Sequence, residues 1–155
     1  MGLRESDKLE PLSGKIVFVI GRSGSGKSSL IAACQNARPS IIGIDDHLRV
    51  RVGIMGASLR AYDSMLGLSF ALAWQGFDVM CPCGGQSREL RDHLRSWIPS
   101  IRLIYIEERG RYYAGYEEPQ DDENILIIPA GASTPEEVEM VMEDLSWKTQ
   151  QLITG

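Results

Sequence analysis

The stretch Gly21-Arg22-Ser23-Gly24-Ser25-Gly26-Lys27-Ser28 follows the apolar run Ile16-Val17-Phe18-Val19-Ile20 and opens a segment of helical composition. Glycines let the backbone curl so that successive N–H groups point at phosphate oxygens, which side chains would obstruct. The helix N-terminus beneath adds further N–H groups and a favourable dipole. The spacing G-x-x-x-x-G-K-S between a strand and a helix therefore predicts a phosphate-binding loop rather than a glycine-rich turn that binds nothing.

The two residues that close this stretch have distinct expected roles. Lys27 is expected to reach the β- and γ-phosphates of a nucleotide, and the Ser28 hydroxyl is placed to ligate Mg²⁺. The predicted cofactors are therefore ATP and Mg²⁺. The residues expected to contact the nucleotide belong to the loop and the start of the helix: Gly21, Ser23, Gly24, Ser25, Gly26, Lys27, Ser28 and Ser29.

Length and composition set the outer bounds. A chain of 155 residues suits one domain with a single core, and we expect a flexible N-terminal segment at 1–13 before a domain at 14–155. The net charge of −5 argues against nucleic acid or an anionic membrane as partner. No apolar run is long enough to span a bilayer. Three cysteines without framework spacing indicate a reducing, cytoplasmic location.

Short apolar runs alternate with segments of helical periodicity along the chain. Strands are predicted at 15–20, 40–44, 77–81, 101–106 and 125–128. Helices are predicted from 28 to about 36, at 59–75, at 86–97, and from an N-cap at Thr134 onward. This alternation predicts an α/β protein with three layers, α/β/α, around a five-stranded parallel sheet. With the loop at 21–28, the arrangement resembles the fold of phosphate-loop nucleoside triphosphate hydrolases and kinases.

Ligands of such sheets bind at the carboxyl ends of the strands, so the residues that follow each strand are candidates. Asp45 and Asp46 follow the second predicted strand. A carboxylate there can accept a proton from a substrate hydroxyl or hold Mg²⁺ through water. The alternative is that both acids cap the next helix.

Glycines and arginines follow the third predicted strand. Gly84 and Gly85 allow a ligand to approach the backbone closely, and Arg88 and Arg91 share one helix face. The planar arginine fork suits phosphate oxygens, although a solvated face paired with nearby acids is the alternative. Cys81 and Cys83 are interpreted as small core residues near a site, since two sulfurs without further ligands are a weak metal pattern.

Two more arginines, Arg109 and Arg111, follow the fourth predicted strand, where kinases of this architecture carry a lid. They are expected to neutralise the phosphoryl group during transfer; pairing with neighbouring acids is the alternative. The loop at 130–133, after the fifth strand, is expected beneath the base of ATP.

Several stretches together resemble the adenylylsulfate (APS) kinases, within the nucleoside-monophosphate-kinase-like group of phosphate-loop kinases. The loop at 21–29 is close to that family's loop, and Asp45-Asp46-His47-Leu48-Arg49 lies where the family has Asp-Gly-Asp-Asn-x-Arg. The stretch 86–92, Gln-Ser-Arg-Glu-Leu-Arg-Asp, is similar to Pro-Tyr-Arg-Ala-Asp-Arg-Asp. The stretches 114–119 and 134–138 are similar to the family's Thr-Gly-Ile-Asp-Asp-Pro segment and to the start of its last helix.

The resemblance implies an ATP-dependent kinase that phosphorylates a hydroxyl of a small nucleotide-like or phosphorylated metabolite. Asp46 and Arg49 match the second acid and the arginine of the family motif; the first acid, the family's base, aligns with Ile44, so Asp45 is the neighbouring candidate. The expected catalytic residues are Lys27, Asp45, Asp46, Arg109 and Arg111. The expected metal ligands are Ser28 and Asp45. The expected substrate contacts are Asp46, Arg49, Arg60, Gly84, Gly85 and Arg88.

Two departures from the family pattern leave the acceptor open. The family's paired arginines fall at Asp63 and Ser64, unless Arg60 replaces them, and the connection at 107–114 is shorter than the family's basic lid. The alternatives are a kinase for a CDP-linked capsule or phosphonate-type metabolite, and a non-catalytic ATP-binding regulatory subunit. The short lid suggests a site completed by a second copy or a partner subunit.

Overall fold

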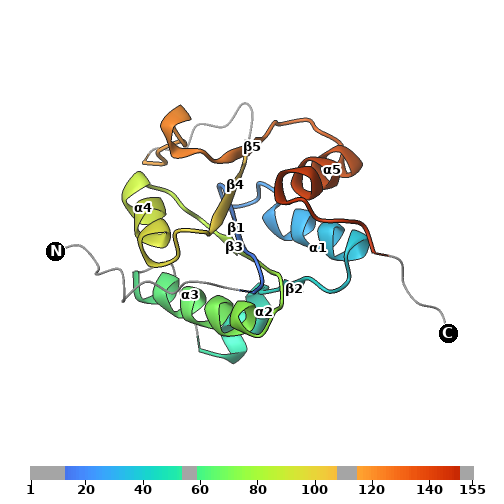
Figure 1. Ribbon diagram of the computed structural model, residues 1–155. Coiled ribbons are helices and arrows are strands. Elements are labelled where there is room, and N and C mark those ends of the chain that lie inside the picture. Colours follow the sequence, from blue (N-terminus) through green and yellow to red (C-terminus); the bar gives the residue numbers. More distant parts are fainter. Residues whose placement is uncertain (1–12, 54–58, 108–114, 151–155) are drawn as a thin grey trace.

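The computed structural model describes residues 13–53, 59–107 and 115–150 (Figure 1). Its centre is a parallel sheet in the order β2-β3-β1-β4-β5. The strands are β1 (Ile16–Ile20), β2 (Ile42–Gly43), β3 (Val79–Cys83), β4 (Arg102–Ile106) and β5 (Leu126–Ile128). The predicted five-stranded parallel sheet is therefore confirmed. No helix in the described ranges is long and apolar enough to cross a membrane.

Helices cover both faces of the sheet, as Figure 1 shows. They are α1 (Lys27–Ala37), α2 (Asp46–Arg51), α3 (Leu59–Trp74), α4 (Arg88–Trp97) and α5 (Thr134–Leu145). Phe18 of β1 packs with the cluster that includes α3 and α4, whereas Val17 and Val19 pack with the cluster of α1 and α5. Because β1 is buried on both faces, its sequence is a continuous apolar run. The predicted three-layer arrangement is confirmed.

The third strand begins and ends two residues later than predicted. It continues through Pro82, which lacks the N–H that a sheet ladder needs. The carbonyl of Met80 accepts a hydrogen bond from Ile44 N (2.9 Å), so the alternation of a strand turns Pro82 toward the same side. There β2 has already ended at Gly43, and the missing donor breaks no ladder bond. This extension places Cys83 and Gly84 beside the end of β1.

Other differences concern short elements. The predicted strand at 40–44 pairs only over Ile42–Gly43, and α2 was not predicted. A 3₁₀ turn, η2 (Asp121–Glu123), which was not predicted either, lies in the connection between β4 and β5. The last helix is capped by Ser133, whose hydroxyl accepts from Glu136 N, rather than by Thr134. β2, α2 and η2 have two, six and three residues, too few for hydrophobic periodicity to specify them.

Candidate functional site

The loop between β1 and α1 has the backbone of a phosphate cradle. Gly24 and Gly26 have φ values of 78° and 101°, a left-handed conformation that L side chains rarely adopt. Gly26 is the N-cap of α1, and it carries no side chain that could occupy the first N–H groups of the helix. Those donors, with the helix dipole, are suited to bind an anion.

Lys27 is the first residue of α1, and its side chain folds back over the loop. Its Nζ donates hydrogen bonds to the carbonyl oxygens of Gly21 (2.9 Å) and Arg22 (2.8 Å). The ammonium group is thereby held above the cradle, where a bound phosphate would meet it. The expected contact of Lys27 with nucleotide phosphates stays a prediction.

A cavity of about 260 Å³ opens at this loop. It lies where β1 and β3 end. Its lining residues are Gly21, Ser23, Lys27, Ser28, Arg49, Pro82, Cys83 and Gly84. The structure therefore brings the loop together with two predicted substrate contacts from distant parts of the chain, Arg49 and Gly84. A larger groove of about 740 Å³ between α1 and α5 is lined by none of the P-loop residues and by none of the predicted site residues.

No protein-family model and no curated protein matches the sequence, but solved structures match the fold. A mutant of the APS kinase CysC from Mycobacterium tuberculosis superposes with a TM-score of 0.68 at 24% identity, over 88% of this chain and 99% of that one. A sugar kinase from Janibacter sp. HTCC2649 superposes at 0.64 and 18% identity, over 86% and 95%. The hexameric APS kinase from Thiobacillus denitrificans gives 0.65 at 23% identity, over 86% of this chain and 29% of that one.

The chain has the fold of the P-loop kinases. The resemblance to APS kinases that the motifs indicated is confirmed at the level of fold.

A second cavity adjoins the P-loop on the side of β2. Its volume is about 250 Å³, and it shares Ser28 and Pro82 with the first cavity. Asp45 also lines it, so the two predicted metal ligands, Ser28 and Asp45, face the same space. Hydroxyl and carboxylate oxygens are the donors that Mg²⁺ prefers, and this pair fits the ion.

Asp45 has a structural task as well. Its Oδ1 accepts a hydrogen bond from Leu48 N (2.7 Å), which caps α2. One carboxylate oxygen of Asp45 therefore caps the helix, as the alternative interpretation expected. The residue nevertheless also lines the second cavity. Asp46 begins α2, and its side chain lies outside the described part of the structure.

Arg49 and Lys27 both line the first cavity, next to Cys83. Burial raises the pKa of the Cys83 thiol to about 12, while the positive charges of Lys27 and Arg49 oppose that rise. The cavity is therefore positively charged and suited to anionic ligands. Cys81 and Cys83 are buried free thiols, as predicted.

The remaining predicted arginines divide into three cases. Arg60 lies exposed in the first turn of α3 and is not among the residues that line the two P-loop cavities. Arg88 makes two hydrogen bonds to Asp122, at 3.0 and 2.9 Å. Arg109 and Arg111 lie outside the described residues. Their roles stay predictions.

Arg22 is a P-loop residue that the sequence did not single out, because the motif accepts any residue at its position. Its Nη1 donates to Tyr105 Oη (2.8 Å), its Nη2 lies 3.3 Å from Glu118 Oε1, and its guanidinium lies 4.7 Å from the Tyr116 ring centroid. Burial disfavours the charged guanidinium, but Tyr105 and Glu118 together raise the pKa of Arg22 above its usual value. Arg22 therefore stays charged at the edge of the site.

Proposed function

We propose that the protein is an ATP- and Mg²⁺-dependent kinase that transfers the γ-phosphoryl group to a hydroxyl of a small nucleotide-like or phosphorylated metabolite. The observation that carries this proposal is the 260 Å³ cavity, where Lys27 and Ser28 of the P-loop meet Arg49 and Gly84. A nucleotide site alone needs only the loop. A cationic side chain and a glycine on the wall opposite the loop provide for a second, anionic ligand.

The residues divide the work of transfer among them. The loop N–H groups and Lys27 bind and orient the triphosphate, and Lys27 exchanges its carbonyl partners for phosphate oxygens. Ser28 and Asp45 would hold Mg²⁺, which supplies neutralisation of phosphate charge when bound. Asp45 or Asp46 orients the acceptor hydroxyl and receives its proton as the oxygen attacks the γ-phosphorus and ADP departs. Arg109 and Arg111 are proposed to neutralise the transferring group.

A regulatory subunit that binds ATP without transfer is the second candidate. The capping bond from Leu48 N to Asp45 favours it, because that bond engages an oxygen the chemistry would use. Incubation with labelled ATP and a panel of phosphorylated metabolites that bear a free hydroxyl, APS among them, separates the two. Label transfer supports the kinase, ATP binding without transfer to any acceptor supports the regulator, and absence of ATP binding contradicts both.

Two single replacements test the assignment of the acids. Asp45→Asn and Asp46→Asn should leave the affinity for ATP nearly unchanged, and the one that removes the base should slow transfer by about a hundredfold or more. Asparagine still offers a side-chain oxygen to Leu48 N, so Asp45→Asn retains the helix cap. Calorimetry gives the affinity and single-turnover kinetics gives the transfer rate.

The matched control is Glu89→Gln, an exposed acid on α4 that loses the same charge. Transfer at the wild-type rate in both aspartate variants would show that neither acid is the base.

A further inference from the structure

The side chain of Arg22, a residue of the P-loop, lies in a clamp formed by the aromatic residues Tyr105 and Tyr116. Tyr105, near the carboxyl end of β4, binds Nη1, and the Tyr116 ring lies against the guanidinium face. Only 6% of Arg22 is exposed. The planar donor is thus fixed in orientation beside the loop before any ligand arrives.

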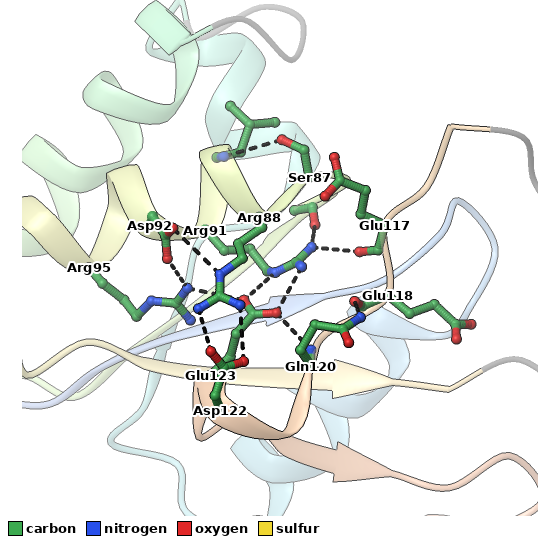
Figure 2. Close-up of polar contacts among 12 residues, drawn as sticks. Ser87, Arg88, Arg91, Asp92, Arg95, Glu117, Glu118, Gln120, Asp122 and Glu123 are labelled. Carbon is green, nitrogen blue, oxygen red and sulfur yellow. Dashed lines mark hydrogen bonds and ion pairs between the residues drawn. The ribbon is translucent and has the colours of Figure 1, made fainter.

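Tyr116 belongs to the segment 115–123, which we call the strap. Residues of α4 hold the strap in place (Figure 2). Arg91 of α4 donates from Nε and Nη2 to both carboxylate oxygens of Glu123, at 2.8 and 3.0 Å. Its Nη1 donates to the carbonyls of Gly85 (2.8 Å) and Glu117 (2.7 Å). The strap backbone is therefore tied to the loop that follows β3.

The strap also reaches the P-loop cavity. Tyr116 Oη donates to the carbonyl oxygen of Gly84 (2.8 Å), and Gly84 lines the 260 Å³ cavity. Gly21, which precedes Arg22, lines the same cavity. Arg22 and Tyr116 are thus each joined to a residue of the cavity wall, Arg22 through the chain and Tyr116 through its hydrogen bond, although neither lines the cavity itself.

Glu118, the carboxylate partner of Arg22, is far more exposed than Glu123, the carboxylate partner of Arg91. The Glu118 side chain is 60% exposed, whereas the Arg22 side chain is 5% exposed, and the pair is separated by 3.3 Å. The side chains of Arg91 and Glu123 are both fully buried, and Arg91 Nε lies 2.8 Å from Glu123 Oε1. An exposed carboxylate in a long ion pair can turn into solvent at small cost. The arginine, packed between tyrosines, stays and presents Nη2 to another anion.

We propose that Arg22 anchors an oxyanion of the acceptor, a carboxylate, phosphate or sulfate group, and that this group displaces Glu118 from Nη2. Tyr105 and Tyr116 hold the guanidinium plane in position for it, and Glu118 occupies the donor when no acceptor is bound. This inference rests on the proposed function, since it assigns Arg22 to the acceptor rather than to ATP.

The test uses inorganic sulfate as probe and the full chain saturated with Mg²⁺ and a non-hydrolysable ATP analogue, so that the P-loop is filled. Sulfate is titrated at constant ionic strength and binding is followed by the rise in melting temperature. We expect Arg22→Met to weaken sulfate binding by roughly tenfold or more, because a charge-assisted contact is lost. Glu118→Gln should tighten sulfate binding, because a neutral amide competes less well for Nη2.

Arg102→Met is the matched control. Arg102 pairs with Asp144 through Nε (2.7 Å) at the opposite end of β4, and its loss should leave sulfate binding unchanged. Arg22→Met could change sulfate binding by perturbing the loop. Glu118→Gln controls for this, because it leaves Arg22 in place and alters only its carboxylate partner.

The outcomes separate this inference from the proposed function. Failure of the wild-type protein to bind the ATP analogue would overturn both. Normal analogue binding with equal sulfate affinity in wild type, Arg22→Met and Glu118→Gln would overturn the Arg22 assignment alone. Sulfate binding that depends on Arg22 only in the absence of the analogue would assign the arginine to nucleotide phosphate and overturn its assignment to the acceptor.

Discussion

Replacing Lys27 with alanine is expected to lower the affinity for ATP-Mg²⁺ by roughly a hundredfold or more, the range of a lost charge-assisted contact with phosphate. Lys27 Nζ lies above the cradle on the carbonyls of Gly21 and Arg22. The truncation therefore removes both the cation that meets the phosphates and a clamp across the loop. Titration calorimetry with a non-hydrolysable analogue measures the effect.

Lys148→Ala is the control for charge, since Lys148 is exposed and follows α5, away from the P-loop. It should bind the analogue as the wild type does. Thermal unfolding of each variant separates a damaged fold from a damaged site. Equal affinity of Lys27→Ala and wild type would show that the loop does not hold nucleotide.

The sequence predicts the sheet well because its strands are apolar on both faces. β1 is a run of five buried residues, and α3 shows helical periodicity over four turns. By contrast, α2 has six residues, and its start depends on the cap that Asp45 provides. The late end of β3 depends on β2 stopping at Gly43, which is a property of the pairing partner and not of β3 itself.

The same distinction applies to the site. Lys27 and Ser28 are recognised because the motif is local and its spacing is fixed. Arg22 gains its environment from Tyr105 and Glu118, which are 83 and 96 residues away in the chain. The shared face of Arg88 and Arg91 is visible in their spacing. Which of them is buried is decided by Glu123, 32 residues beyond Arg91.

Breaking the buried pair between Arg91 and Glu123 is expected to have the largest effect on stability. Both side chains are fully buried, and the pair is bidentate (Figure 2). Removing one partner of such a pair leaves a buried charge without its counter-ion and costs about 3–5 kcal/mol. Arg91→Met should destabilise the protein less than Glu123→Met does, because in Arg91→Met the Arg95 Nη2 still contacts Glu123 Oε1 at 3.0 Å.

The double variant Arg91→Met with Glu123→Met removes both charges. Its free energy of unfolding should fall by less than the sum of the two single effects, because no unpaired buried charge remains. Urea titration of the four proteins gives the coupling. Arg88→Met is the exposed comparison on the same helix and strap. Arg88 and Asp122 are 40% and 66% exposed, so the loss there should be under about 1 kcal/mol.

The pair also predicts a dependence of stability on pH. Burial alone would raise the pKa of the Glu123 carboxyl, but hydrogen bonds from Arg91, Gln120 N and Arg95 lower it from 4.5 to about 2. The folded protein therefore holds this proton less tightly than the unfolded chain does. The stabilisation is complete above about 4.5 and is lost as pH falls toward about 2, roughly 3 kcal/mol in all. Glu123→Gln should remove this component of the pH dependence between those values, measured by urea unfolding in a pH series. An identical slope in Glu123→Gln and wild type would show that other carboxylates account for the acid sensitivity and that Glu123 contributes no buried charge.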